Sequence, residues 1–257
     1  MSRVNRRTLV RRPSPRLAEG LVTHITRSPV DPVLALAQWE GYVAALEAEG
    51  WETVEVAPQD DCPDVAFVED TVVVYGDLAV IARPGADERK PETAGTEAAL
   101  VELGYRIARI EAPGTLDGGD VLKHDGTVWV GLGGRTNPAG VEQLATLLAP
   151  LGATVLGVPL TRVLHLKSAV TALPDGTVIG HEPLVDDPTV WESFLPVPEE
   201  PGAHVVLLDA ETVLMSTNAP RSRALFEERG LRVVAVDIGE FEKLEGCVTC
   251  LSVRLRG

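Results

Sequence analysis

The residues best equipped for chemistry are two cysteines near the end of the chain. Cys247 and Cys250 lie in the segment GCVTCLS. This Cys-x-x-Cys spacing occurs in redox pairs and in halves of zinc sites, but a zinc site needs about four ligands and no second cysteine pair exists. A thioredoxin-like pair would begin a helix, whereas this segment leads into an apolar, strand-like end. Two interpretations remain: Cys250 is a nucleophile, or both cysteines are buried structural residues.

A cysteine nucleophile needs a base, and histidine is the usual one. The chain has five histidines, and His165 stands out because it lies in the apolar stretch VLHLKS. This stretch predicts a strand that precedes a hairpin. A histidine in such a place is either a catalytic partner for the cysteine or a hydrogen-bonded residue of the core.

Acidic residues interrupt two other apolar runs. Glu69 and Asp70 are adjacent within VEDTVVV, where the alternation of a strand would turn one of them inward. Asp64 precedes this run, and Asp117 lies in LDGGDVL, whose glycines permit the close approach of a ligand or a backbone. Burying an acid is costly unless a cation or strong donors accompany it. These acids therefore hold a cationic group, or they pair with internal arginines.

Two arginines occupy turn-like segments, Arg89 in RPGADER and Arg135 in GGRTN. A guanidinium binds a carboxylate in a two-pronged fork, although simple solvation at the surface would also explain both residues. Together with the acids, they describe a pocket for a zwitterion that has a cationic side chain. The cysteine and histidine describe covalent catalysis at an electrophilic carbon.

Composition narrows the class of protein and its partners. The 257 residues include 23 Lys and Arg against 38 Asp and Glu, a net charge of −15. This balance argues against nucleic acid or an anionic membrane as the main partner, and it is compatible with a cationic substrate or with ordinary solubility. The sequence has no apolar run long enough to span a bilayer and no secretory signal. Three cysteines, an odd number, are typical of a reducing cytoplasm, where we expect the protein to reside.

The elements that must position these residues recur along the chain. Turns at positions 76, 125, 175 and 209 each separate two apolar runs, which is typical of hairpins. Helical patterns that mostly end at a glycine and lead into a short apolar strand lie between them. The expected helices are 34–48, 97–103, 139–148 and 221–228, and the expected strands after them are 51–56, 105–110, 153–158 and 231–236.

A unit of hairpin, helix and strand thus recurs about every fifty residues, which predicts radially arranged modules that share a core. Four copies are visible, and the strand-like ends Leu21–Thr26 and Cys250–Leu255 can pair into a fifth and close the ring. The proline-rich residues 182–202 are expected to be loop-like. We expect one closed α/β domain over residues 1–257, with residues 1–8 as a flexible N-terminal extension.

Six motifs in order resemble the dimethylarginine dimethylaminohydrolase family of the guanidine-modifying, or pentein, superfamily. The resemblance covers nearly the whole chain from about Leu9, and it implies a five-bladed α/β propeller of ββαβ modules with pseudo-fivefold symmetry. The motifs are FVEDTVVV (67–74), RPGADER (83–89), LDGGDVL (116–122), GRTNPAG (134–140), HLKS (165–168) and GCVTCLS (246–252).

The resemblance also implies an activity: hydrolysis of Nω,Nω-dimethyl-L-arginine and Nω-monomethyl-L-arginine to L-citrulline and dimethylamine or methylamine. Cys250 would be the nucleophile, passing through a covalent thiouronium, and His165 the general acid and base. Asp117 would orient His165 or the reacting centre. Asp70, with Glu69, would hold the guanidinium.

The rest of the substrate would be bound at its α-carbon. Arg89 and Arg135 would bind the α-carboxylate, while Asp64 and the backbone carbonyl of Leu21, in a lid, would receive the α-amino group. Cys247 has no role in the family mechanism. The resemblance implies no metal and no organic cofactor, a small-molecule partner, and a possible homodimer.

Three alternatives stay open. An arginine deiminase-like hydrolase would act on unmethylated arginine or another guanidine, but deiminases are typically longer and carry an added helical domain. A non-catalytic propeller protein that only binds its partners would lack Cys250 and His165. A thiol oxidoreductase would depend on Cys247 as much as on Cys250.

Overall fold

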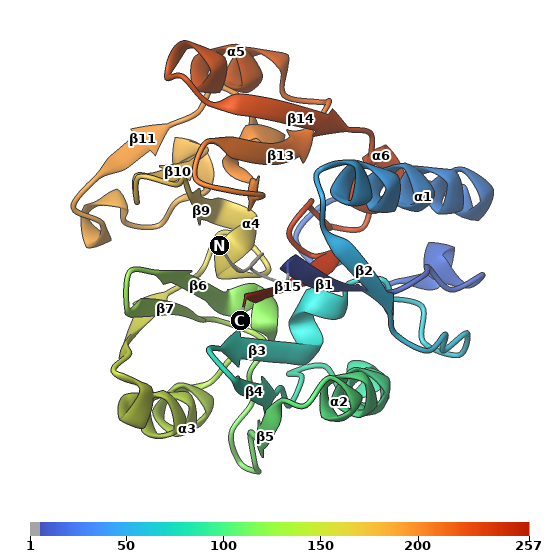
Figure 1. Ribbon diagram of the computed structural model, residues 1–257, viewed down its shortest axis with the longest axis vertical. Helices are drawn as coiled ribbons and strands as arrows, with labels where there is room; N and C mark the ends of the chain where they lie inside the picture. The colour runs from blue at the N-terminus through green and yellow to red at the C-terminus, as the bar shows by residue number, and fades with distance from the viewer. Residues whose placement is uncertain (1–5, 257) are drawn as a thin grey trace.

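Five small sheets of three strands each surround a central axis in the computed structural model, which describes residues 6–256 (Figure 1). The sheets have the strand orders β15-β1-β2, β3-β4-β5, β6-β7-β8, β11-β10-β9 and β12-β13-β14. The strands are β1 (Arg6–Val10), β2 (Glu52–Glu55), β3 (Val72–Tyr75), β4 (Leu78–Ile81), β5 (Arg106–Arg109), β6 (Val121–His124), β7 (Thr127–Leu132), β8 (Thr154–Pro159), β9 (Val170–Ala172), β10 (Val178–Gly180), β11 (Phe194–Pro196), β12 (Val206–Leu207), β13 (Thr212–Ser216), β14 (Arg232–Val236) and β15 (Ser252–Arg256). The helices are α1 (Pro32–Ala48), α2 (Thr93–Glu102), α3 (Pro138–Leu148), α4 (Leu166–Ala169), α5 (Pro220–Glu228) and α6 (Gly239–Glu242).

Each sheet repeats one connectivity. An antiparallel pair such as β3 and β4 is followed by a helix and then by a strand, here β5, that runs parallel to the middle strand. Helices α1, α2, α3 and α5 make this crossover in four sheets and lie on the outside of the ring (Figure 1). The predicted five-bladed α/β propeller of ββαβ modules is confirmed, with one blade, β9-β10-β11, that uses short 3-10 turns in place of the helix.

The helices begin and end at the signals that the sequence carries. Asp31 caps α1 by accepting hydrogen bonds from the backbone N–H groups of Val33 and Leu34, and Asn137 caps α3 in the same way. The glycine that precedes each outer strand after a helix, such as Gly50 before β2, has a positive φ. A glycine adopts this conformation without strain, so the chain turns from the helix directly into the strand.

The core lies between neighbouring blades. Val73 and Val80 of one blade pack with Val121 and Val128 of the next, and Leu144 of α3 joins the same cluster from outside. Because each apolar face is shared by two blades, the blades stabilise one another and hold their inner ends at fixed positions. No helix within residues 6–256 is long and apolar enough to cross a membrane.

The strand that closes the ring is not the one predicted from the sequence. The partner of β15 is β1, paired antiparallel, whereas Leu21–Thr26 is an irregular, bent segment and no strand. Arg6, Arg7 and Thr8 therefore belong to the propeller, so the expected flexible extension 1–8 is wrong for these three, and residues 1–5 lie outside the described part. The charged start of β1 hid a strand whose inner residues, such as Leu9, are fully buried.

Three site segments also differ from the expected strands. Glu69 and Asp70 lie in a 3-10 helix, Val68–Thr71, which buries both side chains and directs them to different sides. His165 is the cap residue before α4 instead of part of a strand. Cys250 closes a turn ahead of β15, with its backbone N–H donating to the carbonyl of Cys247.

Candidate active site

Seven of the nine predicted site residues line one small cavity of about 20 Å³ near the axis. They come from separate blades and from the loops at the inner ends of their strands, so the fold, and not local sequence, assembles them. The seven are Leu21, Asp64, Asp70, Arg89, Arg135, His165 and Cys250. Asp117 does not line this cavity but contacts Nε2 of His165, and Glu69 lines a different cavity.

His165 is held between two carboxylates. Its Nε2 lies 3.0 Å from Oδ2 of Asp117, and its Nδ1 lies 3.7 Å from Oδ1 of Asp70. Burial opposes a charge on the ring, but Asp70 and the hydrogen bond with Asp117 prevail and raise the pKa of His165 to about 9. The ring therefore carries its proton at neutral pH, and Asp117 is hydrogen-bonded to its Nε2.

Asp70 carries a negative charge beside the protonated His165. Its Oδ2 lies 2.5 Å from Nη1 of Arg89, and its Oδ1 accepts from the backbone N–H of Gly119. Burial alone would raise its pKa, but His165 and Arg89 together lower the pKa of Asp70 to about 2. The cavity thus contains a permanent negative charge that a cationic ligand can approach.

The two predicted arginines differ in their surroundings. Arg89 is saturated: besides Asp70 it binds Glu92, with Nη2 2.7 Å from Oε2, and the carbonyls of Asp64 and Phe67. Arg135 has a longer ion pair, with its Nη1 3.9 Å from Oδ2 of Asp117. Sequence reasoning missed Glu92, although its place three residues after Arg89 on one 3-10 helix was a usable signal.

Loop residues 20–25 cover the cavity. The backbone N–H of Leu21 donates to both oxygens of Asp64, at 3.2 and 3.1 Å. Further along, the N–H groups of Thr23 and His24 donate to the carboxylate of Glu245, at 2.8 and 2.6 Å. A cavity of about 20 Å³ holds roughly one water, so a ligand the size of an amino acid enters only when this loop moves. Glu245 is a second residue that sequence reasoning missed.

The two cysteines of the motif touch. Their sulfurs are 3.4 Å apart, and the backbone N–H of Cys247 points at the sulfur of Cys250 at the same distance. The hydrogen bond to Cys247 and burial, together with the charges of Glu69 and Asp70, raise the pKa of the Cys250 thiol. Cys250 is therefore a neutral thiol until a cation comes close.

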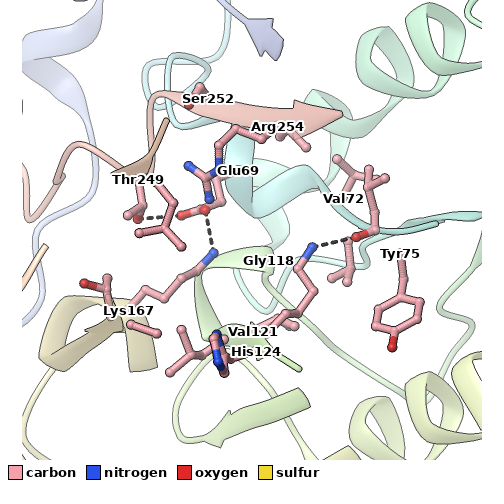
Figure 2. A pocket seen from close by; sticks show the side chains of 18 of the residues that line it. Glu69, Val72, Tyr75, Gly118, Val121, His124, Lys167, Thr249, Ser252 and Arg254 are labelled. Carbon is pink, nitrogen blue, oxygen red and sulfur yellow. Dashed lines mark hydrogen bonds and ion pairs between the residues drawn. The ribbon is translucent and has the colours of Figure 1, made fainter. Parts of the chain in front are cut away.

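Glu69 faces away from this cavity. Its Oε1 lies 2.5 Å from Nζ of Lys167, and its Oε2 accepts from Oγ1 of Thr249 at 2.8 Å (Figure 2). It lines a separate cavity of about 280 Å³ that Arg254 and His124 also border (Figure 2). The side chain of Glu69 thus points away from the cavity that holds the other site residues, because successive side chains of the 3-10 helix point to different sides. Its backbone N–H nevertheless donates to the carbonyl of Cys250 at 3.2 Å.

Asp120, which sequence reasoning passed over, sets the backbone beside His165. Its Oδ1 accepts from the backbone N–H of Leu166, and its Oδ2 from Oγ1 of Thr136. Burial raises the pKa of Asp120 to about 6. The sequence signal that could have identified Asp120 was its place as the second acid of the LDGGDVL motif.

Among residues 6–256, one group of three offers ligand atoms close enough to hold a metal ion: Asp70, Asp117 and His165. Each of these carboxylates already faces cationic groups, since both contact His165, Arg89 binds Asp70 and Arg135 lies near Asp117. A divalent ion would add charge where cations already balance the acids. The arrangement therefore favours proton transfer over metal binding.

Comparison with known proteins places the chain in a family. No protein-family model matches the chain. Over 252 residues it is 63% identical to the N(G),N(G)-dimethylarginine dimethylaminohydrolase of Streptomyces coelicolor, covering 98% of each chain. It is 33% identical over 251 residues to the protein of the same name from Pseudomonas aeruginosa, covering 96% of this chain and 98% of that one.

A solved structure agrees with these relatives. A cysteine-to-serine variant of the Pseudomonas aeruginosa protein, complexed with citrulline, superposes with a TM-score of 0.92 at 31% identity, covering 98% of this chain and 100% of the other. The shared five-bladed α/β propeller is that of the pentein class. Within that class, the chain belongs to the dimethylarginine dimethylaminohydrolase family.

Proposed function

We propose that the protein hydrolyses Nω,Nω-dimethyl-L-arginine and Nω-monomethyl-L-arginine to L-citrulline and dimethylamine or methylamine. The observation that carries this proposal is the convergence of Cys250, a protonated His165 and the ionised Asp70 on one cavity. Support comes from the 63% identity to a dimethylarginine dimethylaminohydrolase and from the fold shared with a citrulline complex. We propose that the chain acts as one domain, since the cavity draws on several blades.

Substrate binding uses the charges in the cavity. The guanidinium lies against Asp70, whose low pKa keeps it ionised. Arg135, which has the weaker ion pair, binds the α-carboxylate, and Arg89 supports it while remaining bound to Asp70. The α-amino group goes to Asp64 and to the carbonyl of Leu21, which requires the loop to re-form around the ligand. Such positioning alone can supply ~7–11 kcal/mol of the barrier reduction.

The bound cation activates the nucleophile. A guanidinium beside Cys250 lowers the pKa of a thiol that burial and nearby acids otherwise raise. Because His165 already carries its proton, the thiol releases its own proton to solvent, and the thiolate forms beside the guanidinium carbon. The thiolate attacks the guanidinium carbon and gives a tetrahedral adduct. His165 then donates its proton to the departing amine, and the adduct collapses to a thiouronium bound to Cys250.

Water completes the cycle. His165, now neutral, removes a proton from a water molecule, and the hydroxide adds to the thiouronium carbon. Collapse of this second adduct breaks the carbon–sulfur bond, releases citrulline and returns the thiol of Cys250. Asp117 holds the ring of His165 in place through both proton transfers. These steps call for no metal and no organic cofactor.

Release of citrulline from dimethylarginine, monomethylarginine and arginine, measured side by side, tests the proposal. We expect turnover of the two methylated substrates, a loss of at least ~10³-fold in the Cys250→Ser variant and of ~10²–10⁴-fold in His165→Ala. Faster turnover of plain arginine would instead identify a deiminase-like activity. Unchanged turnover in either variant would refute the proposed mechanism.

We further propose that the protein works in the cytoplasm and pairs as a homodimer, in line with the resemblance described above. Three free cysteines support the reducing location. Val33 and Leu34, exposed at the start of α1, offer an apolar surface for pairing. Light scattering coupled to size-exclusion chromatography decides the oligomeric state, and a single monomer peak at micromolar concentration would rule out a stable dimer.

A further inference from the structure

The proposed reaction leaves Cys247 unused, although it touches the nucleophile. The two sulfurs are 3.4 Å apart, and the backbone N–H of Cys250 donates to the carbonyl of Cys247 at 3.1 Å. Such an i to i+3 hydrogen bond defines a turn whose end Cα atoms lie less than about 7 Å apart. A disulfide tolerates Cα separations up to nearly that value. The pair can therefore close by side-chain rotation, without unfolding of the turn.

We propose that Cys247 and Cys250 form a reversible disulfide when the protein meets hydrogen peroxide. Cys247 is then a site of oxidative modification whose reaction withdraws Cys250 and whose reduction restores it. The disulfide itself rests on geometry alone, while its effect on turnover rests on the proposed role of Cys250.

The surroundings of Cys247 make it the sulfur that meets the oxidant. Its sulfur lies 3.3 Å from Oγ1 of Thr249, and the buried His204 acts on it as a positive neighbour. The hydrogen bond from Cys250 and the charge of His204 outweigh burial and lower the pKa of the Cys247 thiol. Thiolates are the reactive form towards peroxide.

A cavity that borders the residue before Cys247 lies on the same side. His204 and Gly246, the residue before Cys247, line a cavity of about 320 Å³. Ser168 borders it too, and its carbonyl lies 3.0 Å from Nε2 of His204. Hydrogen peroxide is little larger than water, so this cavity admits it to the neighbourhood of the sulfur.

The chemistry balances with peroxide as the oxidant. The Cys247 thiolate attacks one peroxide oxygen, the O–O bond breaks, and a sulfenic acid and hydroxide result. The thiol of Cys250 then attacks the Cys247 sulfur, the S–O bond breaks, and water leaves as the sulfur–sulfur bond forms. In sum, two thiols and one peroxide give one disulfide and two waters, and an added dithiol reverses the change.

Peroxide treatment of the purified protein tests the proposal. We expect the intact mass to fall by about 2 Da, the mass of two hydrogens. Peptide mapping should link Cys247 to Cys250, and dithiothreitol should restore the mass and at least nine-tenths of the turnover. Cys62→Ser is the matched control, because this third cysteine lies apart near Arg11 and should leave the result unchanged.

Two variants separate the disulfide from other oxidation. Cys247→Ser should turn over substrate before treatment, form no disulfide, and lose activity that dithiothreitol does not return. Cys247 raises the pKa of Cys250, so without it the Cys250 thiol ionises more readily and over-oxidises. Cys250→Ser should trap the Cys247 sulfenic acid as a dimedone adduct. A wild-type protein without the internal disulfide, or a Cys247→Ser variant that recovers as fully as wild type, would overturn the inference. If no guanidine is turned over, the proposed function fails while the mass and mapping still decide the disulfide.

Discussion

Two acids, Asp117 and Asp70, set the protonation state of His165. Asp117 and Asp70 approach its two ring nitrogens, and the resulting pKa of about 9 keeps the imidazolium formed at neutral pH. A group that must first donate a proton to a leaving amine works best if it is already protonated when the substrate binds. Asp70 has a second proposed role: because its low pKa keeps it ionised, its negative charge is available to the guanidinium of the substrate.

Replacing Asp117 by asparagine tests this preparation. Without the second carboxylate the pKa of His165 should move towards its ordinary value of 6.5, so the imidazolium is lost at lower pH. The basic limb of the kcat profile should shift down, and turnover at pH 8.5 should fall about tenfold. Asp117→Glu retains the charge and serves as the control. A basic limb that stays in place would show that Asp117 does not tune His165.

The same shift links stability to pH. Because folding raises the pKa of His165 from 6.5 to about 9, its contribution is full below pH 6.5 and is lost as the pH rises through 9. The expected contribution is roughly 3 kcal/mol. Urea unfolding at pH 6.5 and 9.5 should show this drop in wild type and a smaller one in His165→Asn. An equal drop in both proteins would contradict the assignment.

Among the elements, the turn before β6 (Val121–His124) controls the spacing of the site. A Cβ added to Gly119 would lie 2.5 Å from Oδ1 of Asp70 and 2.7 Å from Nδ1 of His165. Gly119→Ala should therefore displace both groups, lower turnover by at least ~10²-fold and cost ~1–3 kcal/mol of stability. Gly134→Ala, where a Cβ meets nothing within 4 Å, is the control and should change neither quantity. Normal turnover in Gly119→Ala would mean that the site tolerates rearrangement.

Much of the element pattern was predictable because it depends on local chemistry. Tight turns such as Asp125-Gly126 need residues that tolerate positive φ, and both residues adopt it here. Helix ends at glycines follow the same rule. The ring, and most of the residues that line the cavity, follow from motifs that the chain carries in order.

The predictions that were wrong concern features that depend on contacts between distant segments. Nothing near Arg6 in the sequence shows that Arg256 lies opposite it, so Leu21–Thr26 looked equally suitable as the closing strand. The 3-10 helix that turns Glu69 away from Asp70 is too short to leave a periodic signal. The contact between Glu245 and the loop at Thr23 likewise joins segments more than two hundred residues apart.

At the scale of the whole molecule, closure of the ring stabilises every blade. Strand β1 (Arg6–Val10) lies between β15 and β2 (Glu52–Glu55), with Leu9 fully buried and Oγ1 of Thr8 donating to the carbonyl of Val253. Deleting residues 1–10 should leave two bare strand edges, lower Tm by 10 °C or more, and promote aggregation. Deleting only residues 1–5, which precede β1, is the control. A full-length Tm in the longer deletion would show that the ring does not need this strand.

The pairing of β1 with β15 also imposes an order on biosynthesis. The two strands are separated by nearly the whole chain, as the Thr8 to Val253 hydrogen bond shows. A ribosome therefore releases β1 long before its partner exists, and the fifth blade can assemble only once β15 has been synthesised. Cys250 emerges in the same final stretch. A nascent or truncated chain that stops before residue 250 can thus contain the carboxylates proposed to bind a guanidinium, yet it lacks Cys250, the proposed nucleophile.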